Sequence, residues 1–77
     1  MSMISAEKFC QICDDVWRDR AAILSRRGLM SAEDALVRAV YWRVRKAGGE
    51  PAHSLDSYSP LLDKLVRRCR DEAAQSC

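Results

Sequence analysis

The chain is 77 residues long, which allows one small domain and limits the surface buried on folding to about 60% of what the unfolded chain exposes. Hydrophobic residues make up 48% of the sequence and charged residues 31%, a balance that excludes an intrinsically disordered chain. The formal net charge of +2 excludes a strongly basic or acidic protein and leaves the partner class open. Glycine and proline together account for five residues, which favours helices over a turn-rich β fold.

The N-terminal segment 1–9 lacks a basic region followed by an apolar stretch, so it does not have the pattern of a signal peptide. No apolar run approaches the ~18 residues that a membrane span requires. We therefore expect a cytoplasmic protein without membrane contact. In that compartment the four cysteines are expected to be reduced thiols.

The first predicted helix runs from about residue 5 to residue 27. Ser5 is a good N-cap, and Ile4 and Phe9 have the spacing of a hydrophobic staple. Gly28 suits the position just after the helix end. The apolar residues that recur at helical spacing, and so predict a core face, are Phe9, Ile12, Cys13, Val16, Trp17, Ile23 and Leu24.

The second predicted helix covers residues 32–47. Ser31 and Asp34 form a near capping box at its start, and Gly48 ends it. The connection from the first helix is short, so the two helices are expected to be antiparallel neighbours. The predicted core face of this helix consists of Leu36, Val37, Val40 and Val44.

Residues 48–58 are predicted to be an irregular loop and the most mobile part of the fold, because they hold Gly49, Pro51 and His53 between two helical patterns. The third predicted helix covers residues 59–75, with Pro60 in its first turn. Its predicted inner face consists of Leu62, Leu65, Val66, Cys69 and Ala73. The sequence therefore predicts an all-α, single-domain, three-helix bundle with up-down-up topology.

Cys10 and Cys13 form a C-x-x-C motif inside the first predicted helix. A redox role requires a thiol activated at a helix N-terminus, and these cysteines lie one to two turns further in. A zinc alternative would use Cys10, Cys13 and Cys69, but no four donors converge in a straight bundle. We favour the interpretation that Cys13 and Cys69 are small buried hydrophobic side chains. No metal or other cofactor is expected.

Catalytic chemistry has little support in the sequence. The single histidine, His53, lies in a predicted loop with nothing to orient it toward Ser57 or Ser59. The acidic pairs are adjacent along helices, so their side chains diverge by about 100°. We expect no enzyme and no small-molecule substrate.

Arg20 falls in the middle of the apolar face of the first predicted helix, where an unpaired guanidinium is too costly to bury. Three interpretations remain open. It pairs with Glu72 or Asp71 near the end of the third helix, it extends past that helix into water, or it marks a partner-binding surface.

The second predicted helix also has an outward face, which consists of Arg38, Trp42, Arg45 and Lys46. Trp42 lies about 120–160° around the helix from the core side chains. A tryptophan framed by cations is typical of a binding surface. Residues 26–46 carry six basic and two acidic residues, so the positive charge of the chain is concentrated here.

Three interpretations of Trp42 remain open. Ala35 and Ala39 would let another helix approach, in which case Trp42 is intramolecular core. Otherwise it belongs to an interface with a protein, including a second copy, or with nucleic acid. Against nucleic acid, Glu33 and Asp34 occupy the helix start, where recognition helices contact bases.

The sequence is best interpreted as a small non-catalytic cytoplasmic helical module for protein–protein interaction or self-association. The predicted partner-binding residues are Arg38, Trp42, Arg45, Lys46 and Arg20. The alternative is a nucleic-acid-binding accessory protein that uses the same basic, tryptophan-bearing face.

Overall fold

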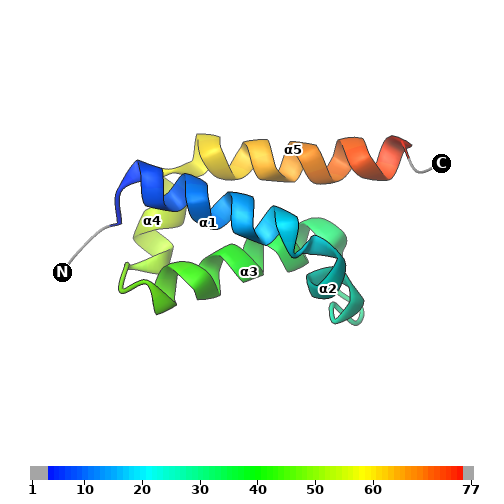
Figure 1. The fold of residues 1–77 in the computed structure, drawn as a ribbon, viewed down its shortest axis with the longest axis horizontal. Coiled ribbons are helices and arrows are strands. Elements are labelled where there is room, and N and C mark those ends of the chain that lie inside the picture. The colour runs from blue at the N-terminus through cyan, green and yellow to red at the C-terminus, as the bar shows by residue number, and fades with distance from the viewer. Residues whose placement is uncertain (1–3, 76–77) are drawn as a thin grey trace.

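The computed structural model describes residues 4–75 and contains five helices in that range, all shown in Figure 1. They are α1 (Ala6–Arg18), α2 (Arg20–Ser25), α3 (Ala32–Lys46), α4 (Pro51–Ser57) and α5 (Ser59–Gln75). The described residues contain no strand, so the all-α class is confirmed, while the expected number of three helices is wrong. Within the same range, no helix is both long enough and apolar enough to cross a membrane.

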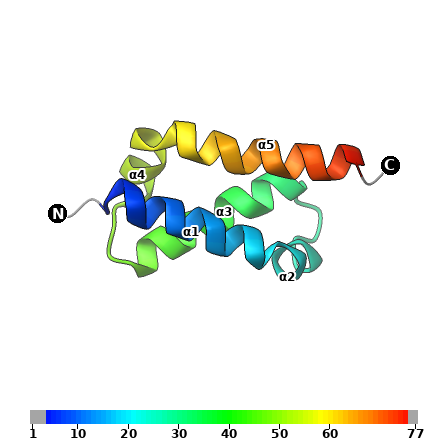
Figure 2. The same cartoon turned by 45° about the horizontal axis from the view of Figure 1, so that its top comes forward.

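The three longest helices supply the core. Figures 1 and 2 show α1, α3 and α5 running in alternating directions along the long axis, with α2 and α4 at opposite ends. α3 contacts each of the four other helices. The buried core cluster consists of Phe9, Ile12, Cys13 and Val16 of α1, Leu36, Val40 and Val44 of α3, and Leu65 and Cys69 of α5. These side chains come from the predicted core faces, because spacing along a helix fixes which residues share a face.

The first helical segment is broken, where one helix over residues 5–27 was expected. Ser5 caps α1 by accepting a hydrogen bond from the Lys8 N–H at 3.1 Å, but α1 ends at Arg18. Asp19 leaves the helical conformation (φ −92°, ψ 8°), and its carboxylate accepts a hydrogen bond from Arg43 of α3 at 2.8 Å. Aspartate is unfavourable in helix interiors, because its side chain competes for backbone hydrogen bonds. The break therefore coincides with a tertiary contact, and it turns α2 onto α3.

The expected loop over residues 48–58 is mostly helical. Pro51 occupies the first turn of α4, where its missing N–H costs nothing, and its side chain is buried. Tyr58 follows α4, with its ring centroid 5.1 Å from that of Phe9 and its hydroxyl donating to the Ile4 carbonyl at 2.8 Å. Gly48 supplies the positive φ of 87° that ends α3. The segment is thus packed instead of being irregular, since α4 contacts α3 and α5 and Tyr58 contacts Phe9 of α1.

Ser54 of α4 has an unsatisfied hydroxyl. Its side chain is 0% exposed, and its Oγ has no hydrogen-bond partner among the described residues. A buried polar group without a partner costs about 1–3 kcal/mol. We expect Ser54→Ala to raise the free energy of unfolding by roughly 1 kcal/mol, measured by urea denaturation. Ser57→Ala, at an exposed position of the same helix, is the matched control; equal effects of the two variants would contradict the explanation.

Candidate functional site

Trp42 lies on the outer side of α3. The opposite side of the helix carries Leu36, Val40 and Val44, which are fully buried against α1 and α5. Trp42 is 49% exposed, so the interpretation of Trp42 as intramolecular core does not hold. Its indole makes an edge-to-face contact with the ring of Tyr41, the two centroids being 5.6 Å apart. One part of the indole therefore contacts Tyr41, and a large part of it is open to solvent.

A shallow groove of about 380 Å³ runs beside Trp42. We call it the α3–α4 groove; it is lined by Asp34, Val37, Arg38, Tyr41, Trp42 and Leu55. Val37 was expected in the core, but it is half-buried and forms part of the groove wall. Open apolar surface next to an exposed indole can receive an apolar side chain of a partner.

Two residues of the groove, Tyr41 and Leu55, are not predicted by the sequence patterns. Leu55 lies on α4, and the interpretation of residues 48–58 as a loop left the groove without its second wall. The signal was present, because Pro51, Ser54, Leu55 and Tyr58 recur at helical spacing. A proline in the first turn of a helix and a proline in a loop look alike in sequence, which is why the pattern around Pro51 predicts a loop.

Three cations lie beside Trp42 on α3, and one of them, Arg38, also lines the groove. The Arg45 guanidinium lies 5.5 Å from the centroid of the Trp42 ring, and Arg38 and Lys46 are exposed. Within residues 4–75, no carboxylate forms an ion pair with any of these three side chains. Arg43 of the same helix differs, since it is 2.8 Å from the Asp19 carboxylate. The predicted residues Arg38, Trp42, Arg45 and Lys46 thus share one side of α3, with their charges available to a partner.

Arg20 is held within the chain and does not line the α3–α4 groove. Its guanidinium forms an ion pair with the Glu72 carboxylate at 2.9 Å and donates to the Trp17 carbonyl at 2.8 Å. It also lies over the Trp17 ring, 4.2 Å from the centroid. Of the three interpretations of Arg20, pairing with Glu72 is the one observed, and it explains an arginine on an apolar helix face.

The cysteines separate into buried and exposed thiols. Cys13 and Cys69 are 8% and 7% exposed and belong to the core cluster, whereas Cys10 is exposed. Burial, followed by the nearby Cys10 and Asp14, raises the pKa of the Cys13 thiol to about 11. Burial also raises the pKa of Cys69. These shifts are opposite to the lowered pKa that activates a redox thiol.

The zinc alternative requires Cys10, Cys13 and Cys69 to converge. Among residues 4–75, no group of three or more histidine, cysteine, aspartate or glutamate side chains is placed to hold a metal ion. His53 lies exposed on α4, and Cys77 is outside the described residues. The described donors therefore do not form the tetrahedral set that structural zinc prefers.

Taken together, the described residues place an exposed indole, a groove between two helices and three unpaired cations on one side of α3. This arrangement can bind a surface that offers apolar and acidic groups. No protein-family model, curated protein or solved structure matches this chain.

Proposed function

We propose that this chain is a small non-catalytic module that binds another protein through the α3–α4 groove and the cations beside it. The observation that carries the proposal is the exposure of Trp42, 49% open beside the groove. Tryptophan and arginine are enriched among the residues that dominate binding energy at protein interfaces. In this proposal the up-down-up core of α1, α3 and α5 serves as a rigid support for the surface.

The charges on this surface favour a different protein over a second copy of the chain. A two-fold symmetric contact places the same patch on both sides of the interface. Arg38, Arg45 and Lys46 would then lie across the interface from the same positively charged patch of the second copy, and like charges across an interface are unfavourable. The partner is therefore expected to present acidic side chains around an apolar one that enters the groove. We place this interaction in the cytoplasm, which is compatible with the free thiols of Cys10, Cys13 and Cys69.

Nucleic acid is the second candidate, because cations hold phosphates and an indole can stack on a base. The same groove contains Asp34, whose carboxylate would repel a phosphate backbone. We therefore rank nucleic acid below an acidic protein partner.

Photo-crosslinking distinguishes these candidates. A benzophenone amino acid replaces Tyr41, which lines the groove, and in a control chain it replaces Arg67, which is exposed on α5. Each chain is produced in the cells from which the sequence derives and is irradiated there. We expect a discrete adduct with a different protein from position 41 and none from position 67.

The other outcomes are equally informative. An adduct of twice the chain's own mass would indicate self-association, and an adduct that disappears on nuclease treatment would indicate nucleic acid. Equal adducts from both positions, or none from position 41, would overturn the proposal.

Charge reversal at Arg38 tests the acidic character of the partner. We expect Arg38→Glu to weaken binding of the crosslinked protein by about 10-fold at low salt, and less at high salt, because exposed charges are screened. Arg67→Glu changes the net charge equally on α5, so it separates a local effect from a general one. Isothermal titration calorimetry at two salt concentrations measures both variants; identical losses would show that Arg38 does not touch acidic groups.

A further inference from the structure

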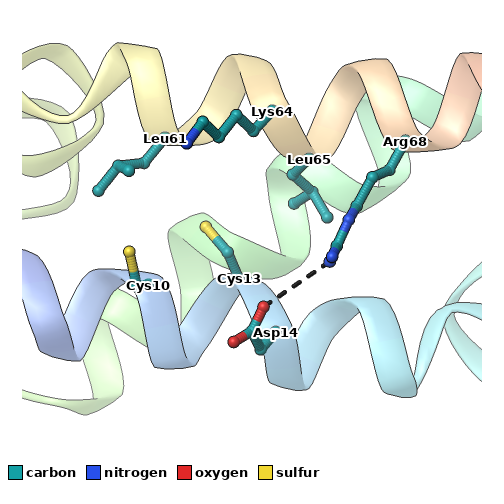
Figure 3. A pocket seen from close by; sticks show the side chains of 7 residues that line it. All are labelled: Cys10, Cys13, Asp14, Leu61, Lys64, Leu65 and Arg68. Atoms are coloured by element: carbon teal, nitrogen blue, oxygen red, sulfur yellow. Dashed lines mark ion pairs between the residues drawn. The ribbon is translucent and has the colours of Figure 1, made fainter.

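A second recess lies on another side of the molecule, between α1 and α5, and Figure 3 shows it from close by. We call it the α1–α5 hollow. Its volume is about 190 Å³, and its lining residues are Cys10, Cys13, Asp14, Leu61, Lys64, Leu65 and Arg68. It shares no residue with the α3–α4 groove, so the proposed protein-binding surface does not account for it.

Two thiols share the helix face that lines this hollow. Cys10 and Cys13 are three residues apart on α1, a spacing that places their Cβ atoms about 5–6 Å from each other. Figure 3 shows both sulfur atoms directed from α1 toward α5. Cys13 is buried while Cys10 is exposed, so an ion in solution can reach the Cys10 sulfur first and the Cys13 sulfur lies deeper in the hollow. The described residues give the Cys13 thiol no hydrogen-bond partner.

The donor set restricts which ion the hollow can hold. No third histidine, cysteine, aspartate or glutamate of residues 4–75 is placed to complete a metal site with these thiols. Thiolates are soft ligands that select Cu(I), zinc and iron–sulfur clusters, and of these zinc and the clusters normally take four protein ligands, which the described residues around the hollow do not supply. Two metal–sulfur bonds of about 2.3 Å, the length found for zinc thiolates, span about 4.6 Å in line. That span is within reach of two cysteines on consecutive turns of one helix face.

We propose that the α1–α5 hollow binds one soft monovalent cation, Cu(I) or Ag(I), between the sulfur atoms of Cys10 and Cys13. Both thiols lose their protons to solvent, two S–M bonds form, and no electron is transferred. The complex of two thiolates with one monovalent cation carries a net charge of −1. Lys64 lines the same hollow, and its ammonium group offsets this charge, whereas the charge of Arg68 is already shared with Asp14 at 3.7 Å.

The test uses the reduced full-length chain without oxygen and free of added thiols. Cu(I) is presented as its bicinchoninate complex, whose colour fades as the protein withdraws the ion. The chain contains four cysteines, so Cys77→Ser, which replaces a thiol beyond the described residues, serves as the control, and Cys10→Ser removes one proposed ligand. Because Cys10 is exposed, Cys10→Ser is expected to keep the fold, and circular dichroism checks this.

We expect the natural chain and Cys77→Ser to withdraw one equivalent of Cu(I) with equal affinity. Cys10→Ser is expected to bind at least about 100-fold more weakly, since loss of an outer partner alone costs 10- to 100-fold. Lys64→Gln should keep the stoichiometry and lower the affinity. X-ray absorption of the loaded chain should show two sulfur neighbours. No uptake by the natural chain, or undiminished affinity in Cys10→Ser, would overturn the proposal.

Discussion

Trp42→Ala is expected to weaken binding of the partner protein about 30-fold or more, which corresponds to the 2 kcal/mol that defines a binding hot spot. The reason is that an indole in a partner's pocket loses all its contacts when it is truncated. The free energy of unfolding should change by less than about 1 kcal/mol, because half of the side chain is already exposed. Isothermal titration calorimetry and urea denaturation measure the two quantities.

The control for this variant is Leu29→Ala. Leu29 is the other large hydrophobic side chain that is exposed among the described residues, and it lies in the α2–α3 connection, outside the groove. Its removal tests whether any exposed apolar side chain contributes to binding. Equal losses for Trp42→Ala and Leu29→Ala would assign the effect to general hydrophobicity instead of the groove.

Leu36→Ala is expected to lower the free energy of unfolding by about 2–5 kcal/mol, the range for leucine truncations in protein cores. Leu36 is 0% exposed at the centre of the core cluster. A chain of this length has a total stability of roughly 4–12 kcal/mol, so one truncation removes a large part of it. Urea denaturation followed by circular dichroism gives the value.

Leu29→Ala is the matched control here as well, because it makes the same chemical change at a fully exposed position. We expect it to alter the free energy of unfolding by less than about 0.5 kcal/mol. Comparable losses at positions 36 and 29 would show that the core is not where the structure places it.

Local features of the fold were predictable from the sequence. Ser5 and Ser31 cap α1 and α3 as expected, because N-capping depends on residues within one turn. The apolar stripes contain every side chain of the buried core cluster, but they also contain Val37 and Val66, which are half-buried, and Ala73, which is exposed. The contact of Arg20 with Glu72, 52 residues apart, was one of three interpretations that helical angles and the high cost of an unpaired buried charge left open.

Features that depend on packing between helices were not predictable. The break at Asp19 accompanies its contact with Arg43, 24 residues away, and nothing in the local pattern indicated it. α4 was missed because Pro51 and two preceding glycines are typical of a loop, while its burial against other helices is tertiary. In short helices, packing outweighs local propensity.

Only the α3 side of the candidate surface was predictable from the sequence. Helical angles placed Trp42 away from Leu36 and Val40, but its exposure depends on whether another helix covers that side of α3. Ala35 and Ala39 left both a covered and an exposed Trp42 possible, because small side chains would let another helix approach that side of α3. The wall of the groove formed by Leu55 could be found only with α4 in place.

The central claim is that the exposed face of α3 is where a protein partner binds, and fluorine NMR tests it most directly. The chain has two tryptophans, so labelling with 5-fluorotryptophan gives two resonances, one from Trp42 and one from Trp17 beside Arg20. On addition of the crosslinked partner, we expect the Trp42 resonance to shift and the Trp17 resonance to stay in place. A shift of Trp17 alone, or of neither tryptophan at saturation, would contradict this assignment of the binding surface.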